Sequence, residues 1–221
     1  MALILSLDST TSFCSAAIHE DGILIDSDTD NETRTAASKL AVIAKNLLDK
    51  HGISAKNLSS VAVCSGPGSY TGLRIAASTA KGICFAIEKP LIAADSLQVM
   101  TYAIVNTIDA ELFCPMLDAR RMEVYCSLFN SNLEMVMPIE AKILTDQSFS
   151  EDLKSSRIAF FGDGSVKFKA LANHTNAIFV DSINPNAKDL GILAFEKFVK
   201  KDFEDLANFE PFYLKDFIMK R

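Results

Sequence analysis

The sequence predicts an α/β fold in two similar halves, each built on a mixed sheet. Three observations support this prediction. A buried strand and a β-hairpin occupy residues 2–28, helices and strands then alternate up to residue 107, and the same order starts again at residue 112. We expect one half over residues 1–106 and a second, shorter and more degenerate half over 107–221.

Local signals predict each element of the first half. Asp8 ends the apolar run of the first strand, the Asp21-Gly22 pair between two apolar runs is typical of a hairpin, and Gly52 ends a helical pattern. Asp95 or Ser96 can cap the third helix. The expected elements are strands 2–8, 13–19, 22–28, 60–64 and 91–94, and helices 35–50, 72–88 and 97–107.

The second half repeats this order with shorter elements. Its first strand ends in Asp118, as the first strand of the chain ends in Asp8, and Asn130-Ser131-Asn132 marks the turn of its hairpin. The expected elements are strands 112–117, 122–129, 133–137, 157–161 and 177–180, and helices near 145–153, 165–172 and 187–200. Three antiparallel strands followed by alternating helices and strands, occurring twice, are typical of the duplicated actin-like or ribonuclease H-like (ASKHA) architecture.

Composition narrows the classes of function. The net charge of −6 and the pI of about 5.1 argue against a chain that binds RNA or DNA by itself. The five scattered cysteines lack a C-x-x-C spacing and are typical of a reducing compartment, so we expect a cytoplasmic protein. The apolar N-terminus has no basic region before it and predicts a buried strand, and we expect no membrane partner because no apolar run approaches the length of a span.

A glycine-rich turn over residues 65–72 is the most distinctive motif. Many proteins bring backbone N–H groups to a phosphate with a strand, a glycine turn and a helix N-terminus in succession. The turn has neither the P-loop lysine nor the dinucleotide spacing, because Gly66, Gly68 and Gly72 are one residue too widely spaced. An anion site and a tight structural connection both remain open. The candidate nucleotide or anion contacts are Asp8, Thr10, Gly66, Gly68, Ser69, Gly72 and Arg74.

Metal and nucleophile signals are weak. His19, His51 and His174 are far apart and have no cysteine at ligand spacing. Asp8 and Asp118 end equivalent strands and could form a Mg²⁺ pair, but no further acidic cluster completes a nuclease site. We expect no metal site and no catalytic residue.

Two helices have apolar stripes wider than one sheet requires. Helix 72–88 has only three charges, Arg74, Lys81 and Glu88, on one narrow stripe, and small residues elsewhere permit close helix approach. A deep core position and a partner surface both explain this pattern; we favour a partner surface. The candidate interface residues are Ala36, Leu40, Ile43, Leu47, Ala76, Thr79, Ala80, Ile83 and Ile87.

Three stretches in order resemble a known family. They are LSLDSTTSFCSAAIHEDG (5–22), SGPGSYTGLRIAASTAKGICFA (65–86) and DARRMEVY (118–125), and GDG at 162–164 and EPFYLKDF at 210–217 extend the match. The chain thereby resembles the TsaB (YeaZ) family over essentially its whole length. The resemblance implies a role in the threonylcarbamoyladenosine modification of tRNA next to the anticodon, as a non-catalytic partner of the transferase TsaD, beside the ATPase TsaE.

The resemblance also implies how the chain acts. TsaD-like enzymes carry an H-x-x-x-H metal motif on the first long helix, whereas TRTAASKLAVIAKNLL here has no histidine. The family's usual polar residues near the start of this helix are replaced by Arg34-Thr35-Ala36-Ala37. The resemblance implies docking on TsaD, a homodimer when alone, tRNA contact only through the complex, and no cofactor for this chain alone, with ATP or ADP at a shared interface. The alternative is a nucleotide-binding hydrolase or transferase of the actin-like ATPase class that uses the turn at 65–72.

Overall fold

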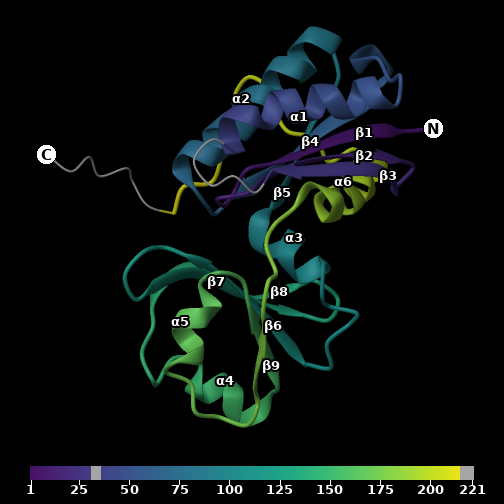
Figure 1. The fold of residues 1–221 in the computed structure, drawn as a ribbon. Coiled ribbons are helices and arrows are strands. Elements are labelled where there is room, and N and C mark those ends of the chain that lie inside the picture. The colour runs from purple at the N-terminus through teal and green to yellow at the C-terminus, as the bar shows by residue number, and fades with distance from the viewer. Residues whose placement is uncertain (31–35, 215–221) are drawn as a thin grey trace, which may run out of the picture. The chain divides into compact units, whose positions relative to one another are not determined.

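The computed structural model describes residues 1–30 and 36–214, and the side chains of residues 36–38 are outside this description. The chain divides into two compact units, unit 1 (1–99 and 185–221) and unit 2 (100–184) (Figure 1). Unit 1 contains the strands β1 (Leu3–Asp8), β2 (Cys14–Glu20), β3 (Ile23–Asp30), β4 (Ser60–Gly66) and β5 (Leu91–Asp95). Its helices are α1 (Ala36–Lys50), α2 (Tyr70–Ile87) and α6 (Ala187–Lys200), and a short 3₁₀ turn spans Ala55–Asn57.

Unit 2 repeats the sheet of unit 1. Its strands are β6 (Leu112–Asp118), β7 (Glu123–Asn130), β8 (Met135–Ile143), β9 (Ile158–Phe161) and β10 (Ala177–Val180). Its helices are α4 (Ser150–Ser155) and α5 (Ser165–Lys169), and α3 (Ser96–Tyr102) spans the boundary between the units.

The two sheets have the same strand order. Sheet 1 runs β3-β2-β1-β4-β5 and sheet 2 runs β8-β7-β6-β9-β10, each with an antiparallel meander followed by two parallel strands. This duplicated order confirms the predicted actin-like α/β fold.

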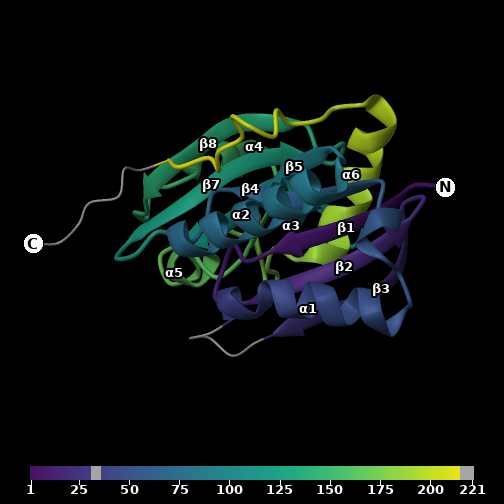
Figure 2. The ribbon, with the colours of Figure 1, turned by 90° about the horizontal axis from the view of Figure 1, so that it is seen from above.

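Helices cover both faces of sheet 1. Helix α1 packs on β2 and β3, α2 packs on β4, and the two helices lie side by side on one face, as Figure 2 shows from above. Helix α6 covers the opposite face (Figure 1). The Ala187 N–H donates to Ser15 Oγ at 2.9 Å, and Gly191 lies directly over the His19 ring. A side chain at position 191 would overlap this ring, so glycine permits the close approach.

The position of α6 corrects the expected boundary at 106–107. Residues 185–221 belong to unit 1, because α6 completes the second face of sheet 1. Sheet 2 has a separate core on its α4–α5 side, where the rings of Phe149, Phe160, Phe168 and Phe179 contact one another.

Several element ends differ from the prediction. Helix α2 begins at Tyr70, two residues earlier than expected, because Ser69 Oγ caps it by accepting from the Gly72 N–H at 3.3 Å. Strand β8 extends to Ile143, well beyond 137, and α3, α4 and α5 are shorter than their apolar patterns suggest. The type and order of the elements are as predicted.

Candidate functional site

The predicted interface residues fall into two groups. Leu40, Ile43, Leu47, Ala76 and Ala80 are all 7% exposed or less and belong to the core between α1, α2 and sheet 1. Their assignment to a partner surface is wrong, because all five side chains are buried in this core and leave no surface for a partner. Thr79, Ile83 and Ile87 are partly exposed on the flanks of α2. Ala36 begins α1, but its side chain is outside the described part of the chain.

The solvent-exposed stripe of α2 is formed by other residues. We define the α2 outer face by its exposed residues, which recur at helical spacing: Thr71, Arg74, Ser78, Gly82, Phe85 and Ala86. Phe85 is 79% exposed, which is unusual for a phenylalanine in a folded chain. A Cβ at Gly82 would have no neighbour within 4 Å, so the helix backbone is accessible there. On α1, Val42 is also exposed, at 56%.

A hollow of about 390 Å³ lies at the other end of this face. It is lined by Tyr70, Thr71, Arg74, Ile75, Ser78 and Thr79. Arg74 is held at its edge, since Nη1 donates to Tyr70 Oη at 2.6 Å and the guanidinium lies over the Tyr70 ring. The outer face therefore has an exposed aromatic ring near its C-terminal end and a hollow near its N-terminal end.

The C-terminal segment runs along the flank of α2. Lys81 Nζ donates to the carbonyl oxygens of Ala207 and Phe209 at 3.1 and 3.0 Å. The Phe212 N–H then donates to Ser65 O at 2.7 Å, and the Tyr213 ring lies 4.9 Å from that of Tyr70. This arrangement of residues 205–214 has no signal in the sequence beyond a lysine on an otherwise apolar helix.

The glycine turn packs against the loop that follows β1. A Cβ at Gly68 would overlap Thr10, and a Cβ at Gly72 would overlap the carbonyl oxygen of Ser9. Two hydrogen bonds join the loops: the Ser69 N–H donates to Thr10 O at 2.7 Å, and Ser9 Oγ donates to Gly72 O at 2.8 Å. At Gly66 a φ of +110° requires glycine.

These contacts favour the structural interpretation of the turn. The N–H groups of Ser69, Gly72 and Leu73 all donate to acceptors within the chain. A helix N-terminus binds an anion through N–H groups that lack such partners. The predicted contacts Gly68, Ser69 and Gly72 are thus occupied in packing one loop on the other. Gly66 lies against Phe212 and Leu73, and Arg74 lies at the hollow described above.

Asp8 and Thr10 lie beneath the turn in a buried polar cluster. Thr10 Oγ1 donates to Asp8 Oδ1, and Ser96 Oγ lies 3.4 Å from Thr10 Oγ1. Burial raises the pKa of the Asp8 carboxyl and of the neighbouring Cys64 thiol. Asp95 accepts from two backbone N–H groups at the start of α3, but burial dominates and raises its pKa to about 6.

The residues considered for metal binding or catalysis do not assemble. Over residues 1–30 and 36–214, no group of three or more His, Cys, Asp or Glu side chains could hold a metal ion. His51 pairs with Asp26, His174 Nδ1 accepts from the Asn176 N–H, and His19 is buried beneath α6. In the same part of the chain all five cysteines are buried and none forms a disulfide, and no helix has the length and apolarity that crossing a membrane requires.

Comparison with known proteins decides the family. A family model described as "TsaD: tRNA N6-adenosine threonylcarbamoyltransferase" matches residues 31–220. The chain is 30% identical to the tRNA threonylcarbamoyladenosine biosynthesis protein TsaB of Bacillus subtilis, over 77% of this chain and 75% of that protein. The chain belongs to the TsaB (YeaZ) family, within the wider family that this model describes. Its TsaB relative in Escherichia coli is 24% identical over 96% of this chain and 94% of that protein.

Solved structures agree with this placement of the TsaB-family chain. A Pseudomonas aeruginosa protein described as similar to peptidase YeaZ superposes with a TM-score of 0.84 at 26% identity, over 97% of this chain and all of that one. YeaZ from the same organism gives a TM-score of 0.82 at 25% identity, over the same shares of the two chains. A polyphosphate/ATP-glucomannokinase from Arthrobacter shares the fold at 11% identity, with a TM-score of 0.53 over 90% of this chain and all of that one. The TsaB-family chain thus has the duplicated fold of this kinase.

Proposed function

We propose that this TsaB-family chain is a non-catalytic subunit for threonylcarbamoyladenosine synthesis in tRNA, and that it acts by docking on a TsaD-type transferase. Membership of the TsaB family supports the role in this modification. Similarity to TsaD supports the choice of partner: a segment of the chain is 33% identical to a tRNA N6-adenosine threonylcarbamoyltransferase of Anaplasma phagocytophilum over 78 residues. Chains that share a fold often pair through equivalent elements.

The observation that carries the proposal is the exposure of Phe85 on the α2 outer face. Beside Phe85 the small residues Gly82 and Ala86 leave the helix backbone open to a second helix, and the charged residues Lys81, Glu88 and Lys89 lie around them. An exposed aromatic anchor with a polar rim is typical of a protein interface. The hollow beside Arg74 lies about 16 Å from Phe85 along the helix, given a rise of 1.5 Å per residue.

The same face serves two partners in this proposal. When the chain is alone, two copies of α2 pair so that Phe85 of each copy enters the hollow of the other, in the self-complementary manner of a twofold dimer. TsaD replaces the second copy because it competes for the same residues. TsaE joins the assembly afterwards, and ATP or ADP binds at the interface that this chain shares with its partner.

Several features argue against catalysis by this chain alone. In the described part of the chain, none of the three histidines hydrogen-bonds to a serine or cysteine, as an activated nucleophile requires. The Ser69 and Gly72 N–H groups of the glycine turn donate to acceptors within the chain, which disfavours the alternative of an actin-like nucleotide hydrolase or transferase. Helix α1 also lacks the paired histidines of a metal motif.

The test is reconstitution of the modification with purified TsaD, TsaE, tRNA and the threonylcarbamoyl donor system. We expect Phe85→Asp to abolish threonylcarbamoyladenosine formation without lowering the melting temperature, because the side chain is exposed. Ile23→Asp is the matched control, since Ile23 is similarly exposed at 74% on the edge strand β3. Full modification with Phe85→Asp would contradict the docking proposal.

A further inference from the structure

The loop between β6 and β7 holds two successive arginines in an unfavourable backbone conformation. Arg120 has φ of +71° and Arg121 has φ of +49°. Residues other than glycine, asparagine and aspartate rarely adopt positive φ, and two in succession are rarer still. A hairpin that needed only to turn would be better served by Asn-Gly.

The surrounding structure holds this loop in place. The Arg120 N–H donates to Asp118 Oδ1 at 2.5 Å, and the Glu123 N–H donates to Arg120 O at 3.1 Å. Lys167 Nζ anchors both sides of the hairpin, since it donates to Asp118 Oδ1 at 2.7 Å and to Glu123 O at 3.0 Å. Backbone strain that neighbouring contacts impose in this way is typical of functional sites.

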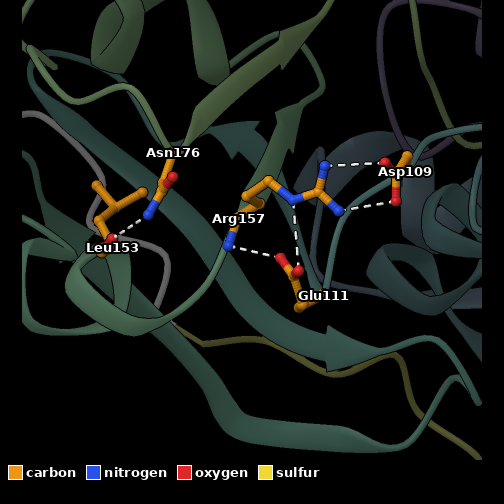
Figure 3. Close-up of polar contacts among 5 residues, drawn as sticks. All are labelled: Asp109, Glu111, Leu153, Arg157 and Asn176. Atoms are coloured by element: carbon orange, nitrogen blue, oxygen red, sulfur yellow. Dashed lines mark hydrogen bonds and ion pairs between the residues drawn. The ribbon is translucent and has the colours of Figure 1, made fainter.

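Both arginine side chains are exposed and lack an acidic partner among the described residues. Every other lysine and arginine of unit 2 has an acidic partner. Arg157 is the clearest example, because its guanidinium is bidentate to Asp109 at 2.8 Å and also meets Glu111, as Figure 3 shows. The remaining pairs are Lys142–Glu140, Lys154–Glu151, Lys167–Asp118 and Lys169–Asp181.

The duplicated fold allows the arginine loop to be compared with the equivalent loop of unit 1. The loop after β1 occupies the same place in sheet 1 as the loop after β6 occupies in sheet 2. In unit 1 that loop contains Thr10, which is buried and hydrogen-bonded within the chain. In unit 2 the corresponding loop instead presents two guanidinium groups to solvent.

We propose that Arg120 and Arg121 bind phosphate groups of the tRNA backbone. The proposal rests on the proposed function, which supplies tRNA as the polyanion that the assembly handles. Planar guanidinium groups bind phosphate oxygens in a bidentate manner, and a polynucleotide offers adjacent phosphates to adjacent arginines. The net charge of −6 disfavours RNA binding over the surface as a whole, which favours a contact confined to a local cluster of arginines.

The experiment measures binding of an unmodified, fluorescently labelled tRNA transcript to the complex of this chain with TsaD. We expect the double change Arg120→Gly and Arg121→Gly to weaken tRNA binding at least about tenfold. The salt dependence should also fall, with the slope of log K against log[salt] smaller in magnitude by about 2, because two phosphate contacts are lost. The melting temperature should not fall, because glycine relieves the backbone strain.

Matched variants separate this contact from general charge effects. Lys154→Ala with Lys169→Ala removes the same charge from exposed positions of unit 2 and should leave tRNA binding unchanged. Arg120→Lys with Arg121→Lys should restore part of the affinity.

The inference would be overturned if the Arg120→Gly, Arg121→Gly variant bound tRNA as well as the wild type, or if the Lys154→Ala, Lys169→Ala control lost as much affinity. It would also be overturned if the arginine variant lost only ATP binding or only assembly with TsaD. Absence of tRNA binding by the wild-type complex would also overturn it. Assembly is measured separately by co-purification, so a failure of docking counts against the proposed function and a failure of tRNA binding alone counts only against this inference.

Discussion

Replacing Gly72 with alanine tests whether the glycine turn is needed for loop packing. A Cβ at this position would lie far inside the 3.0 Å that real Cβ contacts respect, and the atom it meets is the backbone carbonyl oxygen of Ser9. A backbone atom cannot rotate away, so the two loops must separate. That separation also breaks the hydrogen bond from Ser9 Oγ to Gly72 O.

The expected loss follows from three terms. Overpacking costs about 1 to 3 kcal/mol, and the lost buried hydrogen bond costs about 1 kcal/mol. The helix propensity of alanine returns up to about 1 kcal/mol. We therefore expect Gly72→Ala to lower the free energy of unfolding by about 1 to 4 kcal/mol, measured by urea denaturation followed by circular dichroism.

Gly82→Ala in the same helix is the matched control. No atom lies within 4 Å of the added Cβ, so this change should raise the free energy of unfolding by about 0.5 to 1 kcal/mol. Equal effects of the two substitutions would refute the packing argument. A loss of stability with Gly72→Ala that appears only in the presence of nucleotide would instead support an anion site.

Two further predictions concern unit 1. Burial raises the pKa of Asp95 from 3.8 to about 6, so the folded state favours the protonated carboxyl. The stability that this preference provides is complete below pH 3.8 and is lost as the pH rises through 6. Asp95→Asn should therefore flatten this part of the pH dependence in urea unfolding, and an unchanged slope between pH 4 and 7 would contradict the assignment. Lys81→Ala should speed limited proteolysis within residues 205–214, because two hydrogen bonds to that segment are lost. Lys45→Ala, which removes only a surface pair on α1, should not speed it, and equal rates for both variants would be evidence against the role of Lys81.

The order of elements could be predicted from sequence because it depends on local patterns. Asp21-Gly22 marked the first hairpin, and the apolar strands ending in Asp8 and Asp118 revealed the repeat. The boundary between the units could not be predicted in this way. The sequence predicts helix α6 at 187–200, as observed, but nothing in its own residues shows that it returns to sheet 1.

The candidate interface shows a second limit of pattern reasoning. A wide apolar stripe on α2 indicated more buried surface than one sheet needs, but it did not show which side faces the sheet. Ala76 and Ala80 suit close helix approach, and the structure uses them against the strands. Phe85 lies on the opposite side, where its exposure is visible only in three dimensions. Ala80→Arg would therefore disrupt the core and not test docking.

The most direct test of the central claim is the dissociation constant of the complex between this chain and TsaD, measured by titration calorimetry. Burying an exposed phenylalanine contributes about 1.5 to 3 kcal/mol, so Phe85→Ala should weaken the complex by about ten- to a hundredfold. The Ile23→Ala control, on the edge of sheet 1, should leave the constant unchanged. A dissociation constant that Phe85→Ala does not alter would contradict the claim that the α2 outer face is the docking surface.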